Sequence, residues 1–246
     1  MAQRIIIIGA SSGIGRKLAL AYAASGCKVA ISARREPLLK EIAAQYPDDI
    51  TYSTMDVGAA DAVDTLHRMI DSLGGLDLLI YCAGTGFCDP ELTPEKLGVT
   101  LHTNVDGFAS IISAAYRYFR DRAPRVPAQI AAITSVAATK GIGVSAAYSA
   151  SKSFEQKFLE AIAQLAHINR LPLTVTDIRP GFIRTDLLDA SRHYPMLMSP
   201  DYATRLVMSA IRRGRSVDTV DWRWRLLTAA WHLIPRPIWV RLNINF

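Results

Sequence analysis

Three polar residues in the middle of the chain have the types and the spacing of an acid–base site. Tyr148 and Lys152 lie four positions apart, so a helix would place both side chains on one face. Ser135 directly follows an apolar run that predicts a strand. A phenol ionises near pH ~10, and a neighbouring ammonium group favours its ionised form. The arrangement therefore predicts a tyrosine that exchanges a proton near neutral pH.

A glycine-rich segment near the N-terminus has the pattern of a phosphate-binding loop. It follows the apolar run Ile5–Ile8, precedes a helical pattern, and spaces its glycines as G-x-x-x-G-x-G. Glycines let the backbone approach a pyrophosphate closely, and the N-terminus of a helix offers free N–H groups to an anion. The residues expected to hold the cofactor phosphates are Gly9, Ser11, Ser12, Gly13, Ile14 and Gly15.

The end of the second predicted strand bears on which nicotinamide cofactor would bind. An acidic residue here usually holds the ribose 2′-hydroxyl of NAD, whereas an arginine accommodates the 2′-phosphate of NADP. The strand ends at Ala33-Arg34-Arg35, and Glu36 lies past its tip. Two guanidinium groups favour NADP(H), with Arg34 as the expected contact, and leave NAD(H) as the alternative. If both arginines were only solvated residues at a helix start, no preference would follow.

The elements that must position these residues alternate along the chain. Apolar, β-branched runs predict strands over residues 5–8, 29–32, 50–54, 76–81, 129–134 and 173–178. Helices are expected from the glycine-rich loop to about residue 25 and over 36–46, 59–73, 94–122 (broken or bent) and 147–168. The pattern predicts an α/β fold with a single doubly wound parallel sheet, Rossmann-like and flanked by helices. Such sheets bind ligands beyond the carboxyl ends of their strands.

The glycine spacing, the serine at a strand end and the Tyr-x-x-x-Lys pair together resemble the short-chain dehydrogenase/reductase family over residues 4–212. The resemblance implies hydride transfer in which Tyr148 protonates the carbonyl oxygen, Ser135 orients that oxygen, and Lys152 binds the nicotinamide ribose. Asn104 matches the family asparagine that holds a water for proton relay. The alternative for Asn104 is a polar residue that bends its helix.

The same resemblance implies further cofactor contacts, and no metal. They are Asp56 and Val57 near the adenine, Cys82, Ala83 and Gly84 after the fourth strand, and Pro180, Gly181, Ile183 and Thr185 near the carboxamide. Tyr148 and Lys152 also belong to this set. Ile8 and Cys82 depart from the threonine and asparagine usual in the family, but neither departure removes a catalytic group. A small buried residue is the favoured interpretation of Cys82, and a redox sensor is the alternative.

The expected substrate pocket is mostly apolar. Its lining should come from residues 85–87, 136–138 and 142–144 and from the long loop 182–199, which can act as a lid. This lining favours a hydrophobic ketone, aldehyde or secondary alcohol. Arg184, Arg192 and His193 could meet an anionic head group or could simply be solvated. The alternative functions are an NAD-dependent alcohol dehydrogenase and a regulatory protein that senses NADP(H).

Composition excludes several other classes of protein. Half of the 246 residues are apolar and a fifth are charged, which excludes global disorder. The three cysteines lack C-x-x-C spacing, so neither a disulfide scaffold nor a zinc ribbon is expected. The N-terminal apolar run is too short for the core of a signal peptide, and no stretch reaches 18 apolar residues. We therefore expect a reducing, cytoplasmic setting.

The net charge of +6 is concentrated at the C-terminus. Residues 212–246 contain seven arginines, two aspartates and all four tryptophans. We divide the chain into a catalytic domain, 1–212, and a helical extension, 213–246, with helices over about 222–233 and 238–242. Arginine and tryptophan suit the surface of the inner membrane face. An arm packed on the body or across a dimer interface is the equal alternative. Nucleic acid is not expected, and the family resemblance implies a homo-oligomer paired through residues 104–122 and 147–168.

Overall fold

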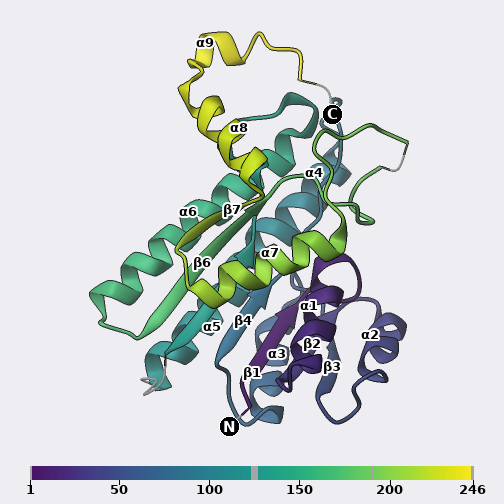
Figure 1. Ribbon diagram of the computed structural model, residues 1–246, viewed down its shortest axis with the longest axis vertical. Helices are drawn as coiled ribbons and strands as arrows, with labels where there is room; N and C mark the ends of the chain where they lie inside the picture. The colour runs from purple at the N-terminus through teal and green to yellow at the C-terminus, as the bar shows by residue number, and fades with distance from the viewer. Residues whose placement is uncertain (1, 123–126, 190, 245–246) are drawn as a thin grey trace.

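A seven-stranded parallel sheet forms the centre of the computed structural model, which describes residues 2–122, 127–189 and 191–244 (Figure 1). The strand order is β3-β2-β1-β4-β5-β6-β7. The strands are β1 (Arg4–Ile8), β2 (Lys28–Ala33), β3 (Ile50–Thr54), β4 (Leu78–Tyr81), β5 (Ala128–Ile133), β6 (Leu173–Pro180) and β7 (Val217–Val220). The doubly wound α/β fold predicted from the sequence is confirmed. The strand order reverses between β1 and β4, which is where sheets of this type open to a ligand.

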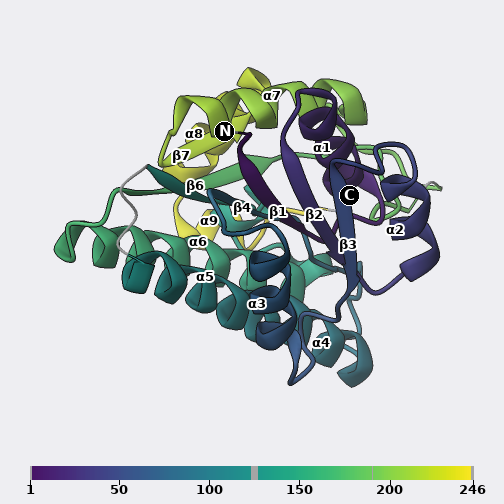
Figure 2. The same cartoon turned by 90° about the horizontal axis from the view of Figure 1, so that it is seen from below.

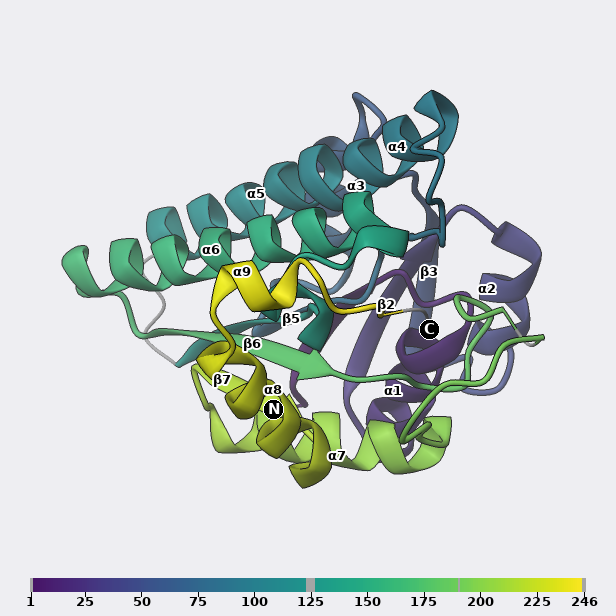
Figure 3. The same ribbon diagram turned by 90° about the horizontal axis from the view of Figure 1, so that it is seen from above.

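Helices cover both faces of the sheet (Figures 2 and 3). One face is packed by α1 (Gly13–Ala24), α2 (Glu36–Ala43), α7 (Pro200–Arg213) and α8 (Trp222–Leu233). The other is packed by α3 (Ala62–Ser72), α5 (Phe108–Arg122) and α6 (Ala146–Ile168). Shorter elements are α4 (Pro94–Leu101), the π-helical turn η1 (His102–Gly107), the 3-10 turns η2 (Val136–Thr139) and η3 (Gly143–Ser145), and α9 (Arg236–Trp239).

The continuous apolar run of β1 follows from this sandwich. Ile5 and Ile7 belong to the core beneath α1 and α2, whereas Ile6 and Ile8 belong to the core beneath α3 and α5. Alternate side chains of a strand point to opposite faces, so a strand covered on both sides needs apolar residues at every position.

The expected bend within residues 94–122 is the π-helical turn η1, which separates α4 from α5. The sequence pattern predicts no helix over 200–213, where the structure has α7, and it predicts the last helix over 238–242. The structure instead begins α9 at Arg236, because Pro237 is tolerated in the first turn, where its missing N–H has no helical partner.

The C-terminal segment packs against the body of the protein (Figure 1, yellow). Its first strand, β7, pairs with β6 and completes the sheet. Trp224, Trp231 and Trp239 are buried, whereas Trp222 is 65% exposed. The indole N–H of Trp239 donates to the carbonyl of Gly141 at 2.8 Å. Within the described residues, no helix is both long and apolar enough to cross a membrane.

Candidate active site

The carboxyl ends of the central strands open onto a cavity of about 380 Å³. All the residues expected to hold the cofactor line it, together with Ser135. These residues are Gly9, Ser11, Ser12, Gly13, Ile14, Gly15, Arg34, Asp56, Val57, Cys82, Ala83, Gly84, Tyr148, Lys152, Pro180, Gly181, Ile183 and Thr185. The fold thus gathers segments far apart in the chain at one edge of the sheet, within the size range of a small-molecule site.

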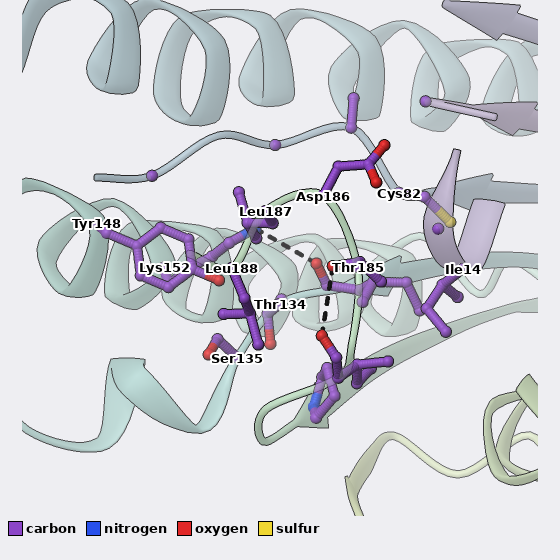
Figure 4. A pocket seen from close by; sticks show the side chains of 18 of the residues that line it. Ile14, Cys82, Thr134, Ser135, Tyr148, Lys152, Thr185, Asp186, Leu187 and Leu188 are labelled. Atoms are coloured by element: carbon purple, nitrogen blue, oxygen red, sulfur yellow. Dashed lines mark hydrogen bonds between the residues drawn. The ribbon is translucent and has the colours of Figure 1, made fainter. Parts of the chain in front are cut away.

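Tyr148 and Lys152 lie side by side on the first two turns of α6 (Figure 4). The Nζ atom of Lys152 lies 5.8 Å from the centre of the Tyr148 ring. The ring also rests on the loop after β4, where a Cβ atom added to Gly86 would lie 2.3 Å from Cδ2 of Tyr148. A glycine at position 86 is therefore what leaves room for the ring.

Ser135 ends the segment that follows β5 and begins the turn η2. Its Oγ accepts a hydrogen bond from the backbone N–H of Ala137 at 3.0 Å, which fixes the side chain in the cavity wall. A hydroxyl that accepts one bond can still donate another. Ser135 therefore can donate to a ligand oxygen in the cavity.

Lys152 contacts a carboxylate that is not among the residues predicted for the site. Its Nζ donates to both carboxylate oxygens of Glu155, at 2.8 and 2.9 Å, and lies 3.4 Å from the carbonyl of Ile133. Both side chains are buried. Burial raises the pKa of Glu155 to about 7, against the opposing charge of Lys152. Burial, the largest single effect, lowers the pKa of Lys152, but the charge and hydrogen bonds of Glu155 together with the charges of Tyr148 and Asp177 outweigh it, so the pKa of Lys152 is raised.

The glycine-rich loop has the backbone geometry that its composition predicted. Gly9 has a φ of +86°, and a Cβ atom there would lie 2.4 Å from the backbone nitrogen of Ala83. A Cβ atom on Gly15 would lie 2.3 Å from the carbonyl oxygen of Gly9. The backbone N–H groups of Gly9 and Ala10 both donate to the carbonyl of Ser32, at 2.8 and 3.0 Å. This packing needs glycine and leaves the N-terminus of α1 facing the cavity.

Arg35, rather than Arg34, contacts the phosphate loop. Its Nη2 donates to the hydroxyls of Ser12 and Ser11 at 2.7 and 3.0 Å, and its Nε donates to Ser11 at 3.2 Å. Arg34 lines the cavity as an exposed residue. The end of β2 therefore presents two guanidinium groups to the cavity, and one of them is held in place by the loop.

Asn104 is not among the residues that line the cavity. It lies in η1, where its Oδ1 accepts from the N–H of Thr85 at 2.9 Å and its Nδ2 donates to the Thr85 carbonyl at 2.7 Å. Nδ2 also donates to the hydroxyl of Ser151 at 2.9 Å. Asn104 thus ties the loop after β4 to α6 from behind. Oδ1 of Asn104 and Nζ of Lys152 both lie close to Gly84.

Cys82 is a thiol at the floor of the cavity. Burial raises the pKa of Cys82 to about 12, so the thiolate that oxidation chemistry requires is scarce near neutral pH. Nearby, Asp56 accepts a hydrogen bond from the backbone N–H of Gly58 at 3.1 Å, which closes the turn after β3. Both residues therefore contribute local shape to the cavity wall.

The substrate side of the cavity is apolar and aromatic. From the expected set, the residues in the wall are Gly86, Phe87, Val136, Ala137, Ile142, Val144, Phe182, Ile183, Leu187, Leu188 and Tyr194. Arg184, Arg192 and His193 do not line it, and Arg192 instead donates to Sγ of Cys88 at 2.9 Å.

Trp224 and Trp231 also line the cavity, although they belong to the C-terminal extension. The rings of Phe182 and Trp224 are 5.5 Å apart, and those of Trp224 and Trp231 are 6.4 Å apart. Gly181 permits this approach, because a Cβ atom there would lie 2.0 Å from the Trp224 indole. Composition marked these tryptophans as unusual, but no local sequence signal placed them in the active site.

A family model described as short chain dehydrogenase matches residues 3–195. The chain belongs to the short-chain dehydrogenases. An uncharacterized oxidoreductase from Myxococcus xanthus is 32% identical to this short-chain dehydrogenase over 241 residues, which cover 95% of this chain and 93% of the relative.

A 3-dehydrosphinganine reductase from Arabidopsis thaliana is 34% identical over 190 residues, which cover 73% of this chain and 56% of the relative. The solved structure titled "ElxO with NADP Bound" superposes with a TM-score of 0.80 at 19% identity, covering 92% of this chain and all of the other. Membership of this family makes the protein an NAD(P)-dependent oxidoreductase.

Proposed function

We propose that this short-chain dehydrogenase reduces a hydrophobic ketone or aldehyde with NADPH, and runs the reverse oxidation of the secondary alcohol. The observation that carries the proposal is the convergence of Ser135, Tyr148 and Lys152 on the cavity that also contains the glycine-rich loop. An acid, a hydroxyl donor and a cation beside a phosphate-binding loop are the groups that such a reduction needs.

The residues around the cavity fit a nicotinamide cofactor. The glycines at positions 9 and 15 allow a backbone approach that a Cβ atom would prevent, and the N-terminus of α1 faces the same space. When bound, the cofactor supplies the hydride. Ser135 would then orient the substrate oxygen, and Tyr148 would give that oxygen a proton as negative charge develops on it. Lys152 would hold the ribose and keep a positive charge beside the phenol.

Arg35 supports a preference for NADPH. Its guanidinium is held by two serine hydroxyls of the phosphate loop, and no carboxylate follows β2 before Glu36. A fixed guanidinium suits a 2′-phosphate, since it offers paired donors and a full charge. The structural neighbour titled with NADP is consistent with this preference. We expect higher kcat/KM with NADPH than with NADH, and the opposite order would favour the NAD-dependent dehydrogenase.

An apolar substrate is favoured by the aromatic wall of Phe182, Tyr194, Trp224 and Trp231. A wall of this kind stabilises a ligand by removing apolar surface from water, at about 25 cal/mol for each Å². One of the relatives is named as a reductase, the 3-dehydrosphinganine reductase, which is consistent with the proposed direction of the reaction. We expect activity in a panel of ketones and aldehydes to rise with chain length. A preference for sugars or hydroxy acids would contradict the proposed substrate class.

Tyr148→Phe is the test of the catalytic assignment. It removes one hydroxyl and keeps the ring that rests on Gly86, so cofactor binding should remain within a few-fold of the wild type. Turnover should fall by a factor on the order of 10² or more, as expected when a general acid is lost. Unchanged turnover would reject the mechanism. A protein that binds NADPH but reduces no carbonyl compound would instead favour the NADP(H)-sensing role.

We also propose that the outer face of the C-terminal extension contacts a membrane surface. Trp222, Leu226 and Leu233 are 65%, 63% and 83% exposed on α8, opposite the buried tryptophans. Since Trp224 lines the active site, truncation would damage the cavity and is a poor test. Vesicles of anionic lipid should pellet the wild type and not a triple variant, Trp222→Ser, Leu226→Ser and Leu233→Ser. Equal pelleting of both proteins would reject a membrane contact.

A homo-oligomer paired through α5 and α6 is the remaining part of the proposal. Leu165 and Ile168 are exposed near the end of α6, where a second copy could cover them. Light scattering after size exclusion should give a mass above the 27.0 kDa of one chain. A single species at the monomer mass would reject this pairing.

A further inference from the structure

The buried carboxylate of Glu155 lies behind the catalytic lysine. Glu155 is fully buried, and its two oxygens receive hydrogen bonds from Nζ of Lys152 at 2.8 and 2.9 Å. The two residues are three positions apart on α6, so the helix itself holds them together. Neither the phosphate loop nor the expected substrate wall includes Glu155, and its burial is not explained by those parts of the site.

The groups around this pair come from β6, from β4 and from the residue that follows β4. From β6, Asp177 faces Glu155 but is itself engaged by Arg179 at 2.7 Å and by the hydroxyl of Thr134 at 2.6 Å. Tyr81, from β4, is also buried near the pair. Burial is the larger cause of the raised pKa of its phenol, and the charge of Glu155 raises that pKa further. Cys82 follows β4, and burial keeps it a thiol.

Lys152 therefore depends on Glu155 for its charge. A buried ammonium is unstable without an anionic partner, because burial favours loss of its proton. In the part of the chain that the structure describes, Glu155 is the carboxylate that forms an ion pair with Lys152. The other acceptor, the carbonyl of Ile133, is longer at 3.4 Å and carries no net charge.

We propose that Glu155 is a positioning residue that acts through Lys152: it keeps the ammonium charged and in place, and so sets the pH at which Tyr148 releases its proton. The inference rests on the proposed function and deepens it, since it adds a fourth residue to the proton-handling part of the site. A carboxylate that does not line the cavity would thus control, through Lys152, the acid–base group inside it.

The expected size of the effect follows from the separation of the groups. The ammonium lies 5.8 Å from the centre of the Tyr148 ring. At that distance, loss of the lysine charge alone shifts a neighbouring ionisation by about two pH units, and loss of the Glu155 anion in the same variant offsets part of that shift. Glu155→Gln keeps the shape and removes the anion, so Lys152 should lose its charge and the phenolate should form at higher pH.

The phenolate of Tyr148 can be followed without cofactor or substrate. The ultraviolet absorbance of each protein is titrated against pH, and the titration of the same protein carrying Tyr148→Phe is subtracted. The difference is the titration of the Tyr148 phenol. In the Glu155→Gln background the midpoint should move up by on the order of one pH unit. The matched control is Glu160→Gln, which removes the exposed partner of Lys157 at the same spacing on the same helix and should leave the midpoint unchanged.

Two further variants separate charge from shape. Glu155→Asp keeps the charge but shortens the side chain, so it should move the midpoint less than Glu155→Gln, whereas a purely structural role predicts the reverse. In a Lys152→Met background, Glu155→Gln should add no further shift, because its effect passes through the lysine. If Glu155→Gln is poorly stable, Glu155→Asp still tests the inference, since a retained charge predicts a midpoint near that of the wild type.

The result that overturns the inference is an unchanged midpoint in Glu155→Gln, or a midpoint moved to lower pH, which would mean that Glu155 mainly repels the phenolate. The rate of alcohol oxidation against pH should show the same upward shift. If the wild type turns over no alcohol or ketone, the proposed function fails, but the titration still decides the role of Glu155.

Discussion

Replacing Gly86 by alanine should disable Tyr148 without changing any catalytic group. The loop after β4 passes directly against the tyrosine ring, and a new Cβ atom would lie 2.3 Å from Cδ2, 2.8 Å from Cγ and 3.0 Å from Cε2. Carbon atoms rest about 3.5–4.0 Å apart at their optimal separation. The ring or the loop must therefore move by roughly 1 Å to relieve the closest contact.

The cost in rate follows from that displacement. A misplacement of about 1 Å in a catalytic group can lower turnover by on the order of 10²-fold, because the proton must be delivered in a narrow geometry. The phosphate loop and Arg35 do not touch Gly86, so binding of NADPH should stay within about three-fold, or 0.6 kcal/mol, of the wild type. The loss should thus appear in kcat.

The assay is steady-state reduction of the best ketone in the panel, with NADPH affinity measured separately by fluorescence. Gly143→Ala is the matched control, since it lies in the turn η3 just before α6 and a Cβ atom there meets nothing within 4 Å. We expect the control to keep nearly full activity. A Gly86→Ala enzyme with the kcat of the wild type would refute the inferred contact between the loop and the ring.

Three other expectations concern stability and cofactor choice. Trp224→Ala should destabilise the fold by about 3–5 kcal/mol and lower Tm by roughly 6–20 °C, because it empties a fully buried site. Trp222→Ala, on the exposed face, should change Tm little. Equal effects of the two substitutions in thermal melts would contradict the packing of the extension. Arg35→Ala should weaken NADPH binding by on the order of tenfold or more while sparing NADH, and a uniform loss for both cofactors would place the guanidinium away from the 2′-phosphate. Burial opposes the ionisation of Asp77, but hydrogen bonds from Arg4 outweigh it and hold the pKa of Asp77 below its ordinary value. The ion pair therefore stabilises the fold fully at pH values above the ordinary pKa of the carboxyl. This stabilisation is lost as the pH falls through the lowered pKa of the folded protein. Asp77→Asn should therefore cost about 1–2 kcal/mol at pH 7 and progressively less as the pH is lowered below the ordinary pKa of the carboxyl in urea titrations, and a cost that does not change with pH would contradict the ion pair.

Much of the fold could be predicted from local patterns. The strands buried on both faces appear as uninterrupted apolar runs such as Ile5–Ile8, and the helix expected over 222–233 is α8 with the same bounds. Helix α7 is not among the helices that the sequence pattern predicts, because it follows a long irregular loop. The bounds predicted for the last helix are wrong, because a proline in the first turn does not interrupt helical hydrogen bonds and α9 begins at Arg236, before Pro237.

The residues of the candidate site likewise divide into those that local spacing predicts and those that only the fold brings together. Spacing along α6 is enough to pair Tyr148 with Lys152, and the i,i+3 spacing pairs Lys152 with the carboxylate of Glu155 by the same rule. The choice between Arg34 and Arg35 was not available locally, because it depends on which guanidinium reaches Ser11 and Ser12 across the sheet edge.

The sequence alone determined the order of elements, the phosphate loop and the spacing of the acid–base residues, because each depends on neighbours within a few turns of chain. Only the tertiary structure decided what the tryptophan-rich extension does. Residues more than forty positions beyond Gly181 return to it, and Trp224 fills the space that a side chain at Gly181 would occupy. Such contacts depend on the path of the whole chain, so composition could mark these tryptophans as unusual but could not place them in the wall of the active site.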